Sequence, residues 1–82
     1  MRIDKFLKVS RILKRRTVAN DACSVGRVSV NGRQVKPSYQ LKTGDEVTLE
    51  LGNRTGRFVV RTLNDMASKE EAATLYEIIS EN

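Results

Sequence analysis

The hydrophobic pattern of this chain changes its period within the stretch GRVSVNGRQV, residues 26–35. Two valines alternate there with polar residues, which is the period of a half-buried strand. Asn31-Gly32 follows, and this dipeptide beside alternating apolar residues is the strongest short signal for a hairpin turn of type I′. The stretch therefore predicts a β-hairpin whose return strand begins at Arg33.

The residues after this hairpin predict two more strands. A half-buried strand is expected over residues 46–51, where apolar and polar residues alternate after a turn at Gly44-Asp45. A loop over residues 52–56 and a last strand over residues 58–63 follow. Together with the hairpin, these segments predict a small, mostly antiparallel sheet of about four strands.

Two helices are predicted before the hairpin. Apolar or small residues recur at i, i+3, i+4 and i+7 from Ile3, which predicts a first helix that ends near Ser10 or Arg11. The second helix is expected to begin with Thr17 as its N-cap and to end at Gly26. Its expected apolar face consists of Val18, Ala19, Ala22, Cys23 and Val25.

A third helix is predicted at the end of the chain. Ser68-x-x-Glu71 matches a capping box, and apolar residues with helical spacing follow it, which predicts a helix over about residues 69–81. The predicted fold class is therefore α+β: two N-terminal helices packed on the small sheet, plus a C-terminal helix. Residues 1–82 are expected to form a single domain.

The charge of the chain is unevenly distributed. Its 82 residues include 15 Lys+Arg and 10 Asp+Glu, for a net charge of +5. Residues 1–16 hold seven basic residues and one acid, whereas residues 62–82 hold one basic residue and five acids. A basic segment of this kind favours a polyanionic partner, and nucleic acid is the default candidate.

Residue types exclude most catalytic chemistry. The chain has no His, which excludes a His general base, Ser-His and Cys-His nucleophiles, and most zinc sites. It has no Gly-rich phosphate loop, and Cys23 falls on a predicted apolar helix face, which favours a core position. We therefore expect no catalytic residue, no metal and no cofactor, and a protein that is not an enzyme.

The sequence also predicts the compartment. No apolar run approaches the roughly 18 to 20 residues of a membrane span, and no h-region follows the first charged residues. A single cysteine permits no internal disulfide and fits a reducing compartment. The expected protein is therefore cytoplasmic and makes no membrane contact.

Lys14, Arg15 and Arg16 stand directly before the predicted start of the second helix. A helix N-terminus carries a positive dipole and unpaired N–H groups, so cations there oppose folding unless an anion binds. This placement indicates a site for a phosphate backbone. Aromatic residues are only 5% of the chain, so recognition is expected to depend on backbone and shape rather than on base stacking. Asp4 has two interpretations: a charge or cap at the start of the first helix, or a carboxylate that orients a neighbouring Arg.

Three stretches match one RNA-binding family in order and near its usual spacing. They are MRIDKFLK at residues 1–8, KRRTVA at residues 14–19 and GRVSVNGRQVKPSYQLKTGDEVTLEL at residues 26–51. Together they resemble the S-four RNA-binding domain, which is named for a small-subunit ribosomal protein. The resemblance covers about residues 1–51 and implies two helices on a small sheet, with RNA along the two-helix face and the adjacent hairpin.

The resemblance also implies which residues contact RNA. Arg2, Asp4 and Arg16 match the RNA-contacting positions of the family motif, and neighbouring basic residues are expected to be auxiliary. The full set of expected RNA-binding residues is Arg2, Asp4, Lys5, Lys8, Arg11, Lys14, Arg15, Arg16, Thr17 and Arg33.

Within the family, this chain is similar to a stand-alone bacterial protein that acts in ribosome-associated quality control. The similarity lies in the short length, the basic run and the tail SKEEAATLYEII at residues 68–79. This resemblance implies a monomeric adaptor that binds rRNA of obstructed large ribosomal subunits and peptidyl-tRNA in the P site. It also implies an RqcH-type elongating factor as partner, so that alanine tails are added to stalled nascent chains. Three alternatives stay open: a heat-shock S-four protein that recycles large subunits, an RNA-binding module or subunit linked to an rRNA pseudouridine synthase, and, as a weaker option, a DNA-binding module.

Overall fold

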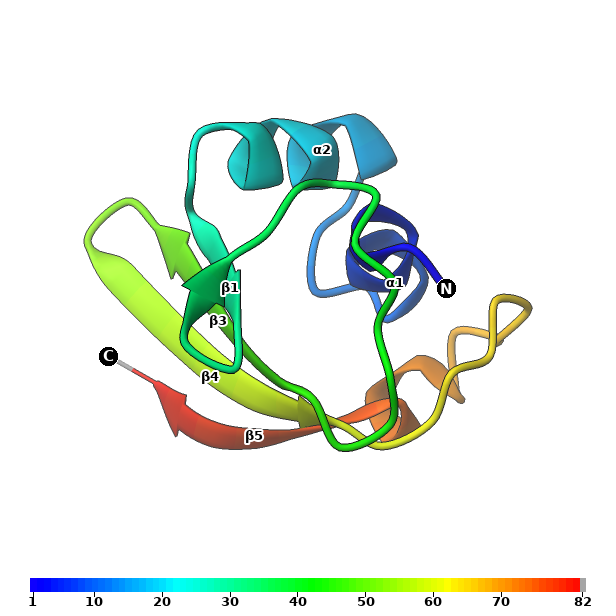
Figure 1. Cartoon of the computed structure of the whole chain (residues 1–82). Coiled ribbons are helices and arrows are strands. Elements are labelled where there is room, and N and C mark those ends of the chain that lie inside the picture. Colours follow the sequence, from blue (N-terminus) through cyan, green and yellow to red (C-terminus); the bar gives the residue numbers. More distant parts are fainter. Residues whose placement is uncertain (82) are drawn as a thin grey trace.

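The computed structural model describes residues 1–81, in which two short helices pack on a five-stranded sheet. The strands lie in the order β2-β1-β3-β4-β5, and all neighbouring strands are antiparallel. Both helices lie on the same side of the sheet (Figure 1). The elements are α1 (Ile3–Val9), α2 (Arg16–Ser24), β1 (Val28–Val30), β2 (Arg33–Gln34), β3 (Glu46–Leu51), β4 (Arg54–Val60), the 3₁₀ helix η1 (Ala72–Thr74) and β5 (Tyr76–Glu81).

The predicted α+β class, with two helices on an antiparallel sheet, is confirmed. The sheet has five strands rather than about four because the end of the chain adds β5. Within residues 1–81, no helix is long and apolar enough to cross a membrane.

The predicted hairpin is β1 and β2. Val30 pairs with Arg33, so the turn consists of Asn31 and Gly32. Their φ angles are 52° and 86°, and a type I′ turn requires positive values at both positions. The side-chain amide of Gln34 donates to the Gly26 carbonyl at 3.0 Å, which ties the hairpin to the end of α2.

The predicted C-terminal helix over about residues 69–81 is wrong. The capping box itself forms, because the Ser68 N–H donates to the Glu71 carboxylate at 3.0 Å and the Glu71 N–H donates to Ser68 Oγ at 3.3 Å. Only η1 follows it, and from Tyr76 the chain pairs with β4 as strand β5. Without β5, strand β4 would leave backbone N–H and C=O groups unpaired, and the Tyr-Glu-Ile-Ile run has residue types that favour strands.

Helix α2 begins two residues earlier than predicted. Arg15 is the N-cap, with extended backbone and no side-chain hydrogen bond to the helix, and Arg16 is the first helical residue. Thr17 is therefore an exposed residue inside the first turn rather than the cap. The ion pair of Arg16 with Asp4 of α1 favours this earlier start, because it holds Arg16 against α1. Two expected apolar residues, Val18 and Val25, are 45% and 67% exposed, because the helix buries only its narrow small-residue face. The buried ones are Ala19, Ala22 and Cys23.

The turn between β3 and β4 is shorter than the predicted loop over residues 52–56. Leu51 pairs with Arg54, so the antiparallel ladder continues up to a turn of Gly52 and Asn53. Arg54 therefore belongs to a strand, and β4 ends at Val60 and is followed by β5. The predicted last strand over residues 58–63 therefore covers the end of β4, residues 58–60, and three residues of the connection that follows it.

Aromatic side chains join α1 to the sheet. The rings of Phe6 and Phe58 stack with centroids 6.3 Å apart, and Tyr76 meets Phe58 edge-on at 5.5 Å. Both phenylalanines are buried, and burial of such a side chain stabilises the fold by roughly 1.5 to 3 kcal/mol. These contacts fix α1 across β4 and β5.

The irregular connection between β2 and β3 holds the start of α1. The Ile3 N–H donates to the Tyr39 carbonyl at 2.8 Å, and the Leu41 N–H donates to the Met1 carbonyl at 2.9 Å. These two hydrogen bonds lie on either side of Arg2 in the chain. The backbone of Arg2 is therefore fixed by a segment far away in the sequence.

Candidate nucleic-acid interface

A buried carboxylate stands at the start of α1. Asp4 is 1% exposed, and its two oxygens accept a side-on pair of hydrogen bonds from Arg2, from Nε at 3.2 Å and from Nη2 at 3.0 Å. One oxygen also accepts the Lys5 N–H at 2.8 Å. Both interpretations of Asp4 hold, because the side chain satisfies a backbone group in the first turn of α1 and orients Arg2.

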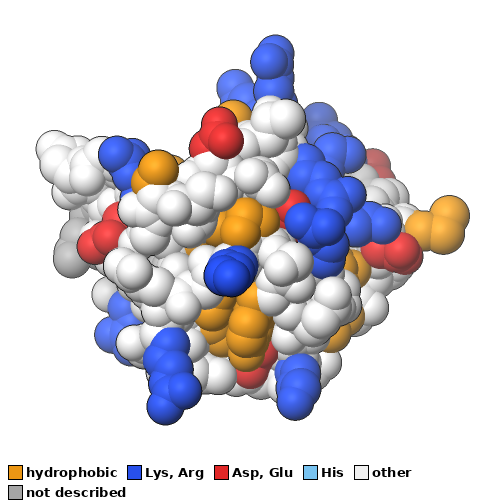
Figure 2. Space-filling model, turned by 45° about the horizontal axis from the view of Figure 1, so that its top comes forward, with side chains coloured by type: hydrophobic (Ala, Val, Ile, Leu, Met, Phe, Trp, Pro, Cys, Tyr) orange, Lys and Arg blue, Asp and Glu red, His pale blue; other side chains and the backbone are white. Residues whose placement is uncertain are grey.

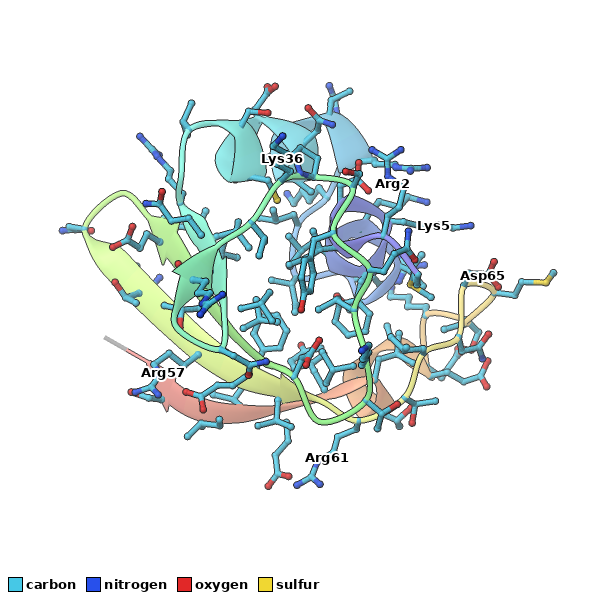
Figure 3. The ribbon with its side chains drawn as sticks, viewed as in Figure 1. Arg2, Lys5, Lys36, Arg57, Arg61 and Asp65 are labelled. Atoms are coloured by element: carbon cyan, nitrogen blue, oxygen red, sulfur yellow. The ribbon has the colours of Figure 1, made fainter. Side chains whose placement is uncertain are left out.

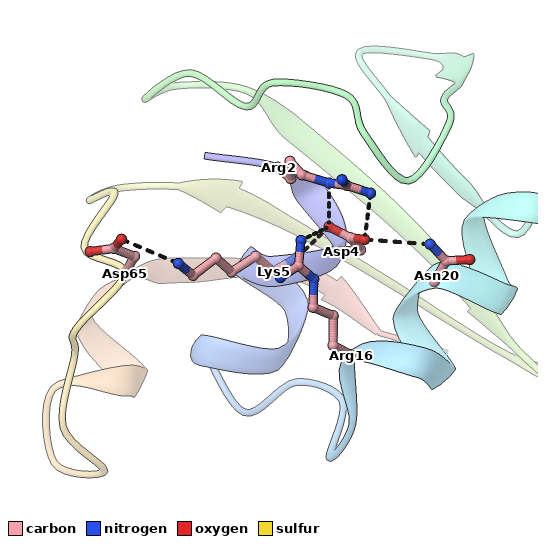
Figure 4. A network of polar contacts seen from close by, with 6 residues as sticks. All are labelled: Arg2, Asp4, Lys5, Arg16, Asn20 and Asp65. Carbon is pink, nitrogen blue, oxygen red and sulfur yellow. Dashed lines mark hydrogen bonds and ion pairs between the residues drawn. The ribbon is translucent and has the colours of Figure 1, made fainter.

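Helix α2 brings two further donors to the same carboxylate (Figure 4). Arg16 Nη2 lies 3.4 Å from Oδ1 of Asp4, and Asn20 Nδ2 lies 3.5 Å from Oδ2. Arg16 and Asn20 are four residues apart, so they share one face of the helix. The carboxylate of α1 thus holds α2 in place and sets Arg2 and Arg16 beside each other.

Asp4 carries its negative charge at neutral pH. Burial is the largest single influence on its pKa and raises it. Hydrogen bonds from Arg2, Asn20 and Arg16, together with the Arg16 charge, outweigh burial and hold the pKa below its ordinary value of 3.8. The cation at the start of α2 therefore faces an anion supplied by α1, which offsets its repulsion from the helix dipole.

The two guanidinium groups stay accessible to a ligand. The side chains of Arg2 and Arg16 are 43% and 46% exposed, and each uses only part of its five N–H donors on Asp4. Two positive groups around one negative group leave a net positive charge. We call this set, Arg2, Asp4 and Arg16, the arginine cluster; its fixed, planar donors suit a phosphate group.

A second ion pair borders the arginine cluster. Lys5 Nζ lies 3.2 Å from Asp65 Oδ2, and Figure 3 shows this carboxylate on the loop that approaches α1. Figure 2 shows the densest group of Lys and Arg side chains at the upper right of the view, with carboxylates beside it, and further separate cations over the rest of this face. The depression beside the cluster is lined by Met1, Arg2, Lys5, Arg16, Gln40, Leu63 and Asp65.

The structure does not bring every predicted residue to the arginine cluster. Lys8, Lys14 and Arg15 are exposed on the last turn of α1 and on the connection to α2. Arg33 lies in β2, at one edge of the sheet. Arg11 lines a different groove, beside β3, β4 and β5.

The sequence interpretation missed two residues beside this cluster. Asn20 carried a weak signal, because it lies in the predicted second helix and follows Arg16 by four residues, but the prediction placed Arg16 just before that helix. Asp65 carried none, since it is 60 residues from Lys5 and only the tertiary fold joins them.

The single cysteine lies buried in α2. Burial, and secondarily the negative charge of Asp4, raise the pKa of the Cys23 thiol to about 11. The thiol is therefore neutral and unreactive in the folded protein, and the predicted core position is confirmed.

Comparison with known proteins places this chain in a recognised family. The S4 domain family model matches residues 1–47. The chain is 49% identical over 81 residues to a Bacillus subtilis (strain 168) protein named RQC P-site tRNA stabilizing factor, and the match covers 99% of this chain and 94% of that protein. A Streptococcus pneumoniae (strain ATCC BAA-255 / R6) protein of the same name is 51% identical over 81 residues, with 99% and 92% covered.

A solved structure shares the whole fold. Trimeric Vibrio cholerae Heat Shock Protein 15 superimposes with a TM-score of 0.88 at 30% identity, and the match covers 98% of this chain and 82% of that chain. The likeness includes β5, since it extends over nearly all of the described residues.

Proposed function

The chain belongs to the S4 domain family, and we propose that it is a non-catalytic RNA-binding factor of ribosome-associated quality control (RQC). The full-length relatives named RQC P-site tRNA stabilizing factor bear out the resemblance to the stand-alone quality-control group, also called RqcP. In this proposal the chain binds rRNA of obstructed large ribosomal subunits and holds peptidyl-tRNA in the P site. It acts as a monomer in the cytoplasm.

The observation that carries this proposal is the arginine cluster. A buried, charged Asp4 holds Arg2 and Arg16 side by side, and both guanidinium groups remain half-exposed. Such a preorganised pair binds RNA phosphates without ordering two flexible side chains at the time of binding. Lys5, Lys8, Arg11, Lys14, Arg15, Thr17 and Arg33 are auxiliary contacts in the same proposal.

The proposed partner beyond RNA is an RqcH-type elongating factor. By holding the P-site tRNA, the chain keeps the peptidyl end in place while alanine residues are added to the stalled nascent chain. The chain itself supplies binding and orientation only.

A second candidate function is that of heat-shock S4 proteins, which act on large subunits in a recycling role. The likeness to Vibrio cholerae Heat Shock Protein 15 favours it. This chain is 49% identical to the Bacillus subtilis relative but 30% identical to the solved heat-shock protein. The quality-control function is therefore preferred.

An alanine-tailing reconstitution tests the proposal. Large subunits carrying peptidyl-tRNA are mixed with an RqcH-type factor and alanyl-tRNA, and tail length is measured with and without this protein. We expect the protein to extend the tails and the Arg2→Ala/Arg16→Ala double variant to lose most of this effect. Lys42→Ala, an exposed cation on the β2–β3 connection, is the matched control and should act like wild type.

Cosedimentation with the same subunits separates the two candidates. Binding without any increase in tailing would favour the recycling function. Absence of binding to large subunits would refute both.

A further inference from the structure

An apolar groove lies away from the arginine cluster, between the α1–α2 connection and the ends of β3, β4 and β5. Figure 3 shows Arg57, one of its lining residues, on a different side of the molecule from Arg2 and Lys5. Of the residues that line this groove, the RNA-binding function proposed above uses only Arg11, as an auxiliary contact. It is lined by Arg11, Ile12, Leu49, Leu51, Arg54, Thr55, Gly56, Arg57, Phe58, Tyr76 and Ile78.

The floor of the groove is an uncovered part of the core face of the sheet. Leu51 of β3 and Ile78 of β5 are 42% and 52% exposed, although Leu51 follows the buried Leu49 and Ile78 follows the half-buried Tyr76 on the same face. Gly56 lies between these strands, and a Cβ built there meets nothing within 4 Å. Its backbone needs no glycine, since its φ is not in the left-handed region. A strand glycine of this kind leaves room for the close approach of another molecule.

The rim of the groove is positively charged. Arg11 and Arg54 are exposed, and Arg57 is paired with Glu46 on the neighbouring strand. Arg11 has a φ of 63°, a left-handed conformation that costs a non-glycine residue roughly 1 kcal/mol or more. Among the side chains that the structure describes, the lining includes no Asp or Glu.

We propose that this groove binds an extended or helical segment of a partner protein that carries aliphatic side chains flanked by Asp or Glu. The aliphatic floor gains from burying apolar side chains, and Arg11 and Arg54 complement carboxylates on either side of them. RNA is disfavoured as the occupant, because Phe58 is buried and aliphatic side chains offer no platform for base stacking. The arginines thus serve two partners: those of the cluster bind phosphate, and those of the rim select an acidic peptide.

A peptide selection tests the groove directly. A phage-displayed library of random peptides of roughly 12 residues is selected on the wild-type protein, with Gly56→Leu as the counter-selection target. The leucine fills the open floor, and circular dichroism and thermal unfolding verify that the variant is folded. We expect enriched peptides to combine at least two acidic and two aliphatic residues, and to perturb the amide resonances of residues 54–58 and 76–78.

Three measurements then decide the proposal. Synthetic copies of the enriched peptides should bind at least about tenfold more weakly to Gly56→Leu and to the charge-reversal variant Arg54→Glu. Both variants should keep wild-type binding to large subunits, which separates this inference from the RNA-binding proposal. Equal enrichment on Gly56→Leu, enrichment of basic or purely polar peptides, or displacement of the peptide by oligouridylate RNA would each overturn it.

Discussion

Two surfaces of this small protein present arginines, and they differ in what lies beneath the guanidinium groups. In the arginine cluster, Arg2 and Arg16 share the buried carboxylate of Asp4. At the groove, Arg11 and Arg54 stand above aliphatic side chains. A buried carboxylate fixes direction, so the cluster suits a small anion of defined shape. An aliphatic floor provides area without direction, so the groove suits an apolar side chain.

The largest expected effect is loss of stability in Asp4→Ala. The substitution leaves Arg2, Arg16 and Asn20 without their shared acceptor, which we expect to lower the free energy of unfolding by about 2 kcal/mol. For a domain of this size that corresponds to a fall in Tm of roughly 8 to 16 °C, measured by thermal unfolding. Asp45→Ala, in a surface turn, is the control and should lose less.

Asp4 also predicts a dependence on pH. Because its pKa in the folded protein lies below 3.8, its contribution to stability is fully present above that value and is lost as the pH falls through the lowered pKa. The difference in stability between wild type and Asp4→Asn should therefore shrink as the pH falls below 3.8. A difference that grows in acid would show that the carboxylate is not stabilised in this way.

The next effect concerns binding. We expect Arg16→Ala to weaken binding to ribosomal RNA about tenfold, the value of one charge-assisted hydrogen bond. If Arg16 neutralises one phosphate, the slope of log K against log salt should fall by roughly 0.7 to 0.9. Stability should change by less than about 1 kcal/mol, because the Arg16 side chain is half-exposed and the buried Asp4 carboxylate keeps its hydrogen bonds from Arg2, the Lys5 N–H and Asn20.

Lys14→Ala is the matched control, since it removes an exposed cation from the same connection. It should change the affinity less than Arg16→Ala. A large loss of stability with unchanged RNA binding in Arg16→Ala would assign Arg16 a structural role only.

Arg11→Gly should stabilise the protein by about 1 kcal/mol, because glycine adopts the left-handed backbone of position 11 without strain. Chemical denaturation measures the change. Lys8→Gly, on the exposed side of α1, serves as the opposite case and should destabilise by roughly 0.5 to 1 kcal/mol. Equal signs for the two substitutions would contradict the strain at Arg11.

The smallest effect is expected for Asp65→Ala. Its ion pair with Lys5 is exposed on both sides, so the loss of stability should be below about 0.5 kcal/mol and should vanish at high salt. The freed ammonium group of Lys5 lies beside the arginine cluster, so RNA affinity should rise by roughly twofold. A fall in affinity, measured by filter binding at low salt, would show that Asp65 supports the RNA surface instead.

Elements fixed by local chemistry were predictable from the sequence. The Asn31-Gly32 turn needs positive φ at both residues, and few other dipeptides allow that. The stripe that begins at Ile3 is buried as predicted, because its helix packs on one side only. In both cases, neighbouring residues in the chain contain the whole cause.

The end of the chain was not predictable in the same way. Ser68 and Glu71 form the expected capping box. The helix that follows this capping box is only the single turn of η1. The deciding partner is β4, whose backbone pairs with Tyr76 and the residues after it. Apolar residues at positions 72, 75 and 76 fit a helix and this turn-then-strand arrangement equally well.

The site was predictable as a set of residues but not as a geometry. Charge and motif point to Arg2, Asp4 and Arg16, and the structure joins these three. The sequence does not show that the carbonyl of Tyr39 accepts a hydrogen bond from Ile3 and so positions the start of α1. Nor does it show that Arg11, which belongs to the same basic run in the sequence, lies on a different surface from the arginine cluster.

The buried, neutral thiol of Cys23 is a natural reporter of local opening in this protein. Alkylating reagents need an accessible thiolate, and a buried thiol with a pKa of about 11 supplies almost none. Labelling therefore requires local opening around Cys23, and its rate reports the free energy of that opening. A ligand that bridges α1 and α2 should slow the alkylation of Cys23, so occupancy of the arginine cluster is measurable without any engineered probe.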